Sequence, residues 1–250
     1  HLADGKAKMV AVTGLSNVLG TKPDLQTIIQ KSHAAGALVL VDATQLAVHD
    51  AIDLQKIDCA FLVCSSHKPY GPTGIGALYG KKKYLEHMVP LLHGSMMIGD
   101  VTEEGFSLAD IPHAFEAGTQ PFAEAVGFAA ALDWISQFPI EDRKAHEKML
   151  LQKALDVLSS IDGIQILGPK DADQISGCIS FTAEGIHPHD LTDILGKNGF
   201  CLRAGHHCAQ PLHNRLKIPA SARLSVGIYN TVEEIEKLGP AIEKILKKFL

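Results

Sequence analysis

Three short apolar runs, each followed by polar residues, constrain the fold more than any other feature of this sequence. They cover residues 9–13, 37–41 and 59–64, and we expect the first and the third to form buried strands. The second run, Ala-Leu-Val-Leu-Val, is apolar throughout, which is typical of a parallel strand covered on both faces. The stretch 24–33 between the first two runs begins with Asp24, a favourable helix cap, and predicts a helix. Such strand–helix–strand spacing predicts a parallel, right-handed α/β sheet.

The chain beyond the third run changes character twice. We expect a fourth strand at 75–79, then a long functional loop at 90–113, because that stretch has no clear periodicity. An alanine-rich, apolar segment at 121–137 predicts a buried helix. After Pro139 an amphipathic helix at 141–160 opens a region of short strands and helices.

We therefore predict two domains, residues 1–139 with the mainly parallel sheet and residues 140–250 as a smaller α+β domain. The chain begins with His1 and reaches its first strand almost at once. The hypothesis is that it is a fragment of a longer protein, with an incomplete sheet in the large domain.

Composition excludes several classes of function. The 250 residues include 23 Lys and Arg and 28 Asp and Glu, a net charge of −5, which offers no basic surface for nucleic acid or anionic membrane. No apolar run approaches the roughly 20 residues that span a bilayer. The five cysteines form no CxxC pair, which indicates reduced thiols and a cytoplasmic protein.

The third run leads into Ser65, Ser66, His67 and Lys68, and a glycine- and proline-rich turn follows at 69–76. Ligands of open α/β sheets bind where the strands end. A lysine desolvated there becomes nucleophilic and can form a Schiff base with an aldehyde such as pyridoxal phosphate. A surface lysine at a strand end is the alternative interpretation.

Further polar residues follow the other strands. Asp42 could pair with the ring nitrogen of a pyridine cofactor, although a helix cap is an equal alternative. Gln45, one turn later, and Asn17 could each bond the cofactor's phenolic oxygen, and Asn17 could instead contact substrate. Ser65 could bind phosphate. His67 could bind phosphate, shuttle a proton or pack as an ordinary histidine.

A second informative stretch lies at 203–211. Cys208 follows His206 and His207 on a glycine-containing loop, a setting that favours a nucleophilic thiolate. Two histidines and a cysteine are also zinc ligands, but adjacent residues point in divergent directions and no further ligand lies at the usual spacing. Arg223 offers a rigid fork for a substrate carboxylate, with a surface ion pair as the alternative.

Taken together, these stretches resemble the SufS-type cysteine desulfurases, which belong to class V of the pyridoxal-phosphate enzymes of fold-type I. The resemblance runs nearly the whole length of the chain. Its motifs, in order, are SNVLG at 16–20, VDATQ at 41–45, SSHK at 65–68, YGPTGIG at 70–76, FEAGT at 115–119, RAGHHCA at 203–209 and YNT at 229–231.

The resemblance implies a three-layer αβα fold and a role for each residue. Lys68 would hold pyridoxal 5'-phosphate and move protons. The other cofactor contacts would be Asp42 to the pyridine nitrogen, Gln45 to the ring oxygen, Ser65 and His67 to the phosphate, and Thr119 to the phosphate in the neighbouring subunit of a homodimer. Asn17 and Arg223 would hold the substrate carboxylate. Cys208 would attack the substrate sulfur, giving a persulfide and L-alanine.

The family passes its persulfide to an acceptor of the SufE or SufU type for Fe–S cluster assembly. The sequence departs from the family in lacking the portion that precedes the first strand, which predicts a fragment that is catalytically incompetent. Gly14 stands where the family often has histidine, and Ala204 where some members have threonine. A selenocysteine lyase uses the same site and stays open. An aminotransferase, epimerase or kynureninase-like enzyme would leave Cys208 unexplained, and a zinc-binding module at His206, His207 and Cys208 would leave Lys68 and Asp42 unexplained.

Overall fold

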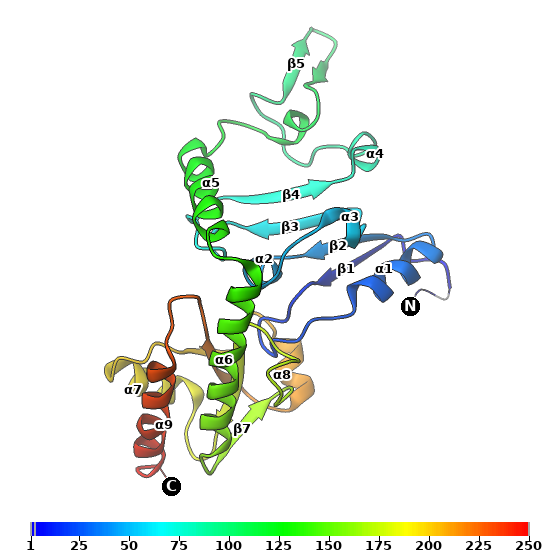
Figure 1. Ribbon diagram of the computed structural model, residues 1–250. Coiled ribbons are helices and arrows are strands. Elements are labelled where there is room, and N and C mark those ends of the chain that lie inside the picture. The colour runs from blue at the N-terminus through cyan, green and yellow to red at the C-terminus, as the bar shows by residue number, and fades with distance from the viewer. Residues whose placement is uncertain (1, 3, 250) are drawn as a thin grey trace. The chain divides into compact units, whose positions relative to one another are not determined.

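The computed structural model describes residue 2 and residues 4–249, and the chain divides into two compact units (Figure 1). Unit 1 is formed by the described residues within His1–Thr13, Leu25–Val48 and Ile52–Gln137. Unit 2 is formed by those within Gly14–Asp24, His49–Ala51 and Phe138–Leu250. Unit 2 therefore includes two short segments from the first half of the chain. The predicted division between residues 139 and 140 would assign both segments to the other domain. The assignment of these units to a cofactor domain and a small domain stays a prediction.

Unit 1 is built on a four-stranded sheet. Its strands, in spatial order, are β1 (Met9–Thr13), β2 (Leu38–Asp42), β3 (Phe61–Ser65) and β4 (Gly76–Gly80). The first three are parallel, as the sequence predicts, and β4 runs antiparallel to β3. The helices of this half are α1 (Leu25–Ala34), α2 (Leu46–His49), α3 (Leu54–Ile57), α4 (Lys82–Leu85), η1 (His113–Phe115) and α5 (Phe122–Ser136).

Two expectations about this sheet need correction. The strand at 75–79 is not a further parallel strand, because the 66–75 connection is shorter than the roughly twelve residues that a parallel crossover needs. The run at 9–13 is not buried: β1 forms an edge of the sheet, and its residues alternate between exposed and half-buried. By contrast, Val39 and Val41 of the central β2 are fully buried.

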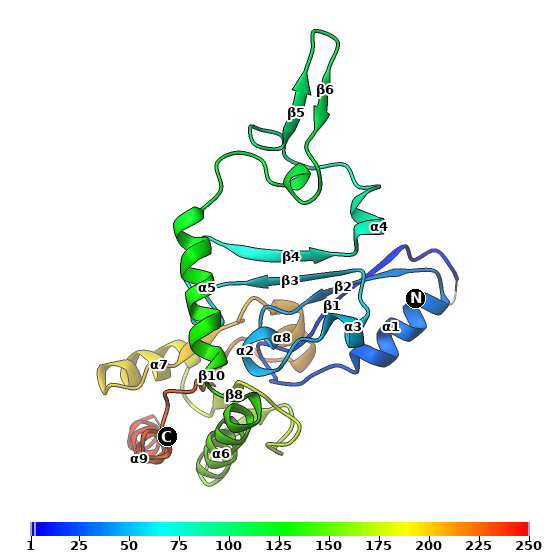
Figure 2. The same cartoon turned by 45° about the horizontal axis from the view of Figure 1, so that its top comes forward.

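The apolar region that follows β4 also differs from expectation. The stretch 90–113 is not structureless, since it contains an antiparallel hairpin of β5 (Ile98–Val101) and β6 (Phe106–Leu108), which projects away from the sheet of unit 1 (Figure 2). Helix α5 is present, but the prediction that it is buried is wrong. Phe122 is 61% exposed and Val126 is 71% exposed, so much of the apolar surface of α5 faces solvent.

Unit 2 contains an antiparallel sheet and its covering helices. The strands, in spatial order, are β7 (Ile164–Leu167), β8 (Cys178–Ala183), β10 (Ser221–Ser225) and β9 (Arg203–Gly205). The helices are α6 (Ile140–Ser159), α7 (Pro188–Lys197), α8 (Gln210–Leu216) and α9 (Val232–Leu246). Helix α9 begins with a capping box in which Thr231 and Glu234 satisfy each other's main-chain N–H groups.

One continuous hydrophobic core holds unit 2 together. Fully buried side chains come from three helices and a strand, namely Leu150 of α6, Phe181 of β8, Leu195 of α7 and Ile242 of α9. Each such side chain stabilises the fold by about 1.5–3 kcal/mol through removal of apolar surface from water. No helix within residue 2 and residues 4–249 is long and apolar enough to cross a membrane.

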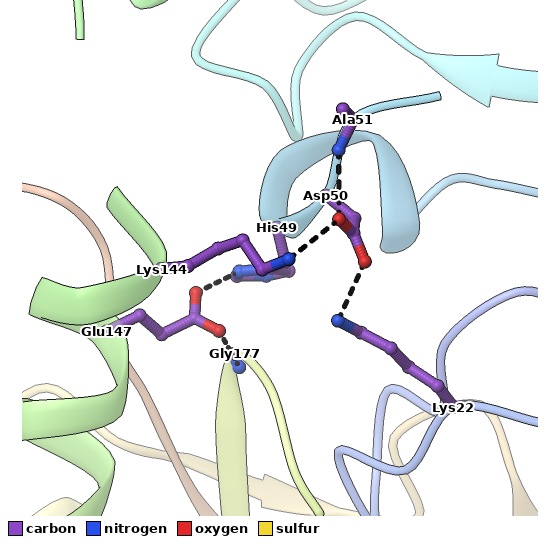
Figure 3. Close-up of polar contacts among 7 residues, drawn as sticks. All are labelled: Lys22, His49, Asp50, Ala51, Lys144, Glu147 and Gly177. Atoms are coloured by element: carbon purple, nitrogen blue, oxygen red, sulfur yellow. Dashed lines mark hydrogen bonds and ion pairs between the residues drawn. The ribbon is translucent and has the colours of Figure 1, made fainter. Parts of the chain in front are cut away.

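Charged and polar contacts fasten the segment 49–51 to the rest of unit 2 (Figure 3). His49 contacts the carboxylate of Glu147 on α6, and the other oxygen of Glu147 accepts a 3.1 Å hydrogen bond from the main-chain N of Gly177. Asp50 forms ion pairs with Lys22 at 3.0 Å and Lys144 at 3.4 Å. Burial alone would raise the pKa of Asp50, but the two lysines hold it below its ordinary value.

Candidate functional site

In unit 1, polar residues gather at the carboxyl ends of two neighbouring parallel strands. Asp42 ends β2 and is paired in register with Val63 of β3, two residues before Ser65 ends that strand. The Asp42 side chain is exposed, and its Oδ1 accepts a 2.9 Å hydrogen bond from the main-chain N of Thr44. The parallel register therefore places Asp42 and Ser65 at the carboxyl ends of neighbouring strands, on the same side of the sheet.

Lys68 lies in a turn that closes back on itself. The buried Ser66 donates from its main-chain N to the carbonyl of Ile75 at 3.1 Å, and its hydroxyl donates to the same carbonyl at 3.0 Å. The main-chain N of Gly71 donates to the carbonyl of Ser66 at 2.9 Å. A Cβ at Gly71 would lie only 2.7 Å from that oxygen, so only glycine permits this closure. These bonds fix the backbone on both sides of Lys68, which is half-buried.

Helix α5 supports this turn from the other side of the glycine-rich stretch. Tyr70, with a φ of 64°, packs edge-on against Trp134 with ring centroids 5.5 Å apart. A Cβ at Gly127 would lie 3.1 Å from the ring of Pro72, so the helix approaches the turn closely. Sequence reasoning missed this support, because no local pattern shows which segment packs against a turn.

Ser65 is the residue of unit 1 that best fits an anionic ligand. Its Oγ is buried, and within residue 2 and residues 4–249 it has no hydrogen-bond partner. An orphaned buried hydroxyl is costly, and a phosphate oxygen would satisfy it. His67 nearby in sequence is exposed, and Gln45, just before α2, is half-buried. Thr119 is exposed in the turn after η1.

In unit 2, Asn17 and Arg223 lie side by side although they are far apart in sequence. Arg223 Nη1 donates to the main-chain carbonyl of Asn17 at 2.9 Å, and Arg223 Nε donates to the hydroxyl of Ser225 at 3.1 Å. The side-chain amide of Asn17 donates to the main-chain carbonyl of His207 at 2.6 Å. Burial lowers the pKa of the Arg223 guanidinium, and Arg203, its partner across the β9–β10 pair, lowers it further.

The loop that carries Asn17 is shaped by local bonds. The Ser16 hydroxyl accepts from the main-chain N of Leu19 at 3.1 Å. Gly20 has a φ of 66°, and a Cβ there would lie 2.8 Å from the carbonyl of Cys178 on β8. The fully buried Ser180 donates to the carbonyl of Val18 at 2.6 Å. Strand β8 thus holds the loop next to Arg223.

Cys208 occupies a strained turn between β9 and α8. His207 and Cys208 both have positive φ, 52° and 62°, a conformation that L residues adopt at a cost of about 1–2 kcal/mol each. The main-chain N of Ala209 donates to the carbonyl of His206 at 2.8 Å and closes the turn. The Cys208 side chain is exposed. Since the preceding carbonyl is bonded to Asn17, the main chain at Cys208 lies next to Asn17, and Cys208 contributes to the electrostatic environment of Arg223.

A buried polar group behind this turn was not expected from the sequence. The hydroxyl of Ser221 lies 3.1 Å from His207 Nε2 and 2.9 Å from His213 Nε2. Burial lowers the pKa of His207 to about 4, and Arg223 lowers it as well. His207 is therefore a neutral, interior side chain, although its neighbours in sequence belong to an exposed loop. No sequence signal connects residues 207, 213 and 221.

The candidate residues thus form two groups, one in each unit. In unit 1, Asp42 and Ser65 lie at the carboxyl ends of β2 and β3, and Lys68 lies in the turn that follows β3. Unit 2 gathers Asn17, Arg223 and Cys208. Within the described residues, no three His, Cys, Asp or Glu side chains are grouped so that they could hold a metal ion.

Comparisons with known proteins agree on one family. The model of the family described as Aminotransferase class-V matches residues 1–238. A cysteine desulfurase of Haloferax volcanii is 44% identical over 249 residues, and a probable cysteine desulfurase of Halalkalibacterium halodurans is 42% identical over 244 residues. These alignments cover 100% and 98% of this chain but only 58% and 59% of the relatives, so the chain spans about three fifths of their length.

Solved structures confirm the fold class. A cysteine desulfurase from Escherichia coli superimposes with a TM-score of 0.93 at 36% identity, covering 98% of this chain and 61% of that one. A cysteine desulfurase from Thermococcus onnurineus gives a TM-score of 0.94 at 34% identity, covering 99% and 63%. The mainly parallel α/β fold that the sequence predicts is therefore confirmed.

Proposed function

Because the chain belongs to the aminotransferase class-V family, we propose that its protein is a pyridoxal-phosphate-dependent cysteine desulfurase. The proposed reaction converts L-cysteine to L-alanine and leaves a persulfide on Cys208. The observation that carries the proposal is the assembly in unit 2 of an exposed thiol beside an arginine fork and an asparagine amide. An amino-acid substrate needs such a fork for its carboxylate, and sulfur transfer needs such a thiol.

The residues of unit 1 would hold the cofactor, which acts as an electron sink for the substrate's α-carbon. Lys68 would bind its aldehyde carbon and move protons at the substrate. Asp42, oriented by the Thr44 N–H, would hold a proton on the pyridine nitrogen, and Gln45 would bond the ring oxygen. The buried, unpartnered hydroxyl of Ser65 and the exposed ring of His67 would bind the phosphate. Thr119 would reach the phosphate in the partner subunit of a homodimer.

The residues of unit 2 would perform the sulfur transfer. Arg223 and Asn17 would orient the substrate carboxylate, so that the substrate sulfur faces Cys208. The Cys208 thiolate attacks that sulfur, an S–S bond forms and the C–S bond breaks. The electron pair of the broken bond stays on the β-carbon, which takes a proton. L-cysteine and the Cys208 thiol thus give L-alanine and a persulfide on Cys208.

The motif set further favours the SufS type, with a SufE- or SufU-type acceptor that takes the persulfide sulfur for Fe–S cluster assembly. The absence of CxxC pairs from the sequence favours a cytoplasmic enzyme. A selenocysteine lyase is the second candidate, because selenium would occupy the same position facing Cys208. Competition between L-cysteine and L-selenocysteine separates them: a kcat/KM ratio far in favour of the selenium substrate would replace the first proposal with the second.

Two measurements test the main proposal. Incubation with pyridoxal phosphate, borohydride reduction and peptide mass spectrometry should place the cofactor on Lys68, and the label should vanish in Lys68→Ala. The full-length protein should release alanine from L-cysteine, and its Cys208→Ser variant should form no persulfide. Cys201→Ser, which alters another exposed thiol of unit 2, is the matched control and should retain activity. Undiminished sulfur transfer in Cys208→Ser would overturn the mechanism.

A further inference from the structure

Three buried side chains lie in a row behind the Cys208 turn. The Ser221 hydroxyl bridges His207 Nε2 and His213 Nε2, at 3.1 and 2.9 Å. His213 and Ser221 are fully buried, and His207 is 2% exposed. The other ring nitrogen of His213, Nδ1, lies 3.0 Å from the main-chain carbonyl of Ala209. The row therefore begins at the residue before Cys208 and returns to the residue after it.

The chemistry of these atoms fixes the direction of every hydrogen bond. The Ala209 carbonyl can only accept, so His213 Nδ1 carries a proton and donates it. In the ring form that carries a single proton, the other ring nitrogen is a hydrogen-bond acceptor. His213 Nε2 is then a bare acceptor, and the Ser221 hydroxyl donates to it. The Ser221 oxygen consequently accepts from His207 Nε2–H.

One independent observation agrees with this direction. The chain of bonds leaves His207 Nδ1 without a proton. That atom is buried and, within residue 2 and residues 4–249, has no hydrogen-bond partner. A buried acceptor without a partner costs less free energy than a buried N–H group without one. The His207 tautomer that the hydrogen-bond chain requires is therefore also the one that its surroundings favour. Burial also keeps the His207 ring neutral, with a pKa lowered to about 4.

We propose that Ser221 and His213 are positioning residues that clamp the Cys208 turn from both sides. The clamp is the directed chain from His207 Nε2–H through the Ser221 hydroxyl and His213 to the Ala209 carbonyl. It stabilises two consecutive left-handed residues that would otherwise relax. The inference rests on the proposed function for its catalytic consequence, which is a thiol presented in one fixed direction beside the Asn17–Arg223 pair.

The wild-type chain offers a first test that needs no turnover. Nitrogen-15 NMR at neutral pH distinguishes the two imidazole tautomers. We expect His207 to be protonated at Nε2 and His213 at Nδ1. The opposite tautomer at either residue would break the directed chain and overturn the inference, whether or not the protein proves to be a desulfurase.

Hydrogen exchange in Ser221→Ala provides the second test. Loss of the bridging hydroxyl should speed exchange of the Ala209 amide, which closes the turn, by about tenfold, since both bonds of the bridge disappear. Ser221→Thr retains the hydroxyl and should restore slow exchange. Ser32→Ala removes a fully buried hydroxyl from α1 in unit 1 and should leave the Ala209 amide unaffected. His213→Met, which removes the acceptor nitrogen, should match Ser221→Ala. Unchanged exchange in both variants would refute the clamp.

Kinetics of the full-length protein connect the clamp to catalysis. Ser221→Ala should lower kcat for persulfide formation by about tenfold, because the thiol samples more directions, and leave KM for L-cysteine within about twofold of wild type. A rise in KM at unchanged kcat would place Ser221 in substrate binding instead and contradict the positioning role. If wild type shows no desulfurase activity, the proposed function fails, while the NMR and exchange tests still decide the clamp.

Discussion

Arg223 donates a 2.9 Å hydrogen bond to the main-chain carbonyl of Asn17, a residue 206 positions earlier in the chain. Strand β10 supplies the arginine and the loop after β1 supplies the carbonyl, and both belong to unit 2. Together with the 3.1 Å bond from Nε to the Ser225 hydroxyl, this bond fixes the plane of the guanidinium fork. Asn17 is in turn bonded to the carbonyl that precedes Cys208, so one short path links the arginine to the thiol.

Arg223→Lys should weaken substrate binding more than chemistry. Lysine retains the charge but loses the planar fork and cannot keep both the Asn17 bond and a two-point grip on a carboxylate. We expect KM for L-cysteine to rise about tenfold or more in the full-length protein, with a smaller change in kcat. Arg215→Lys on α8 is the control and should match wild type. Equal KM values for Arg223→Lys and wild type would exclude Arg223 from carboxylate binding.

Stability should fall between neutral and acidic pH because of His207. Its pKa is lowered to about 4 in the folded chain, against about 6.5 in an unfolded one, so the unfolded state binds the proton first as pH falls. Stabilisation by the neutral ring is therefore complete above pH 6.5, declines between 6.5 and 4, and is level below 4.

Urea unfolding at pH 7 and pH 5, followed by circular dichroism, measures the contribution of His207 to the free energy of unfolding. From pH 7 to pH 5, wild type should lose about 2 kcal/mol more than His207→Gln. His87→Gln replaces an exposed histidine and should behave as wild type. If His207→Gln and wild type show the same pH dependence, His207 is not the buried neutral group described.

Glu147→Gln should destabilise unit 2 and release the segment 49–51. The carboxylate contacts His49 with one oxygen and accepts from the Gly177 N–H with the other (Figure 3), whereas an amide has only one oxygen acceptor and no charge. We expect a loss of about 1–3 kcal/mol in the free energy of unfolding, measured by urea titration. Glu243→Gln on the exposed face of α9 should change it by less than about 0.5 kcal/mol. Similar small effects of both substitutions would mean that the contacts of Glu147 contribute no net stability.

Gly71→Ala should open the turn that carries Lys68. The added Cβ would lie 2.7 Å from the Ser66 carbonyl, so the backbone must shift and the 2.9 Å bond from the Gly71 N–H is strained. We expect a loss of about 1–3 kcal/mol in unfolding free energy and weaker labelling of Lys68 by pyridoxal phosphate. Gly196→Ala on α7 meets no atom within 4 Å and should be neutral or slightly stabilising. Full labelling in Gly71→Ala would show that the closure does not position Lys68.

Local pattern in the sequence predicted most of the strands and helices and pointed to candidate residues for the site. Apolar runs predicted β1, β2 and β3, because short apolar runs bounded by polar residues favour extended strands. Asp42 and Lys68 were expected at the C-terminal ends of neighbouring strands, since parallel strands end on the same side of a sheet. The sequence could not show that α5 is exposed, because an apolar helix has the same sequence whether or not another segment covers it.

Residues far apart in the chain meet only through tertiary packing. The bond between Arg223 and Asn17, and the bridge of Ser221 between His207 and His213, arise where separate elements fold onto one another. Local pattern carries no information about such pairs, because propensity and periodicity act over a few residues and hydrogen bonds act through space. His207 was expected on a polar loop, and packing against β10 and α8 made it a buried neutral ring beside Cys208.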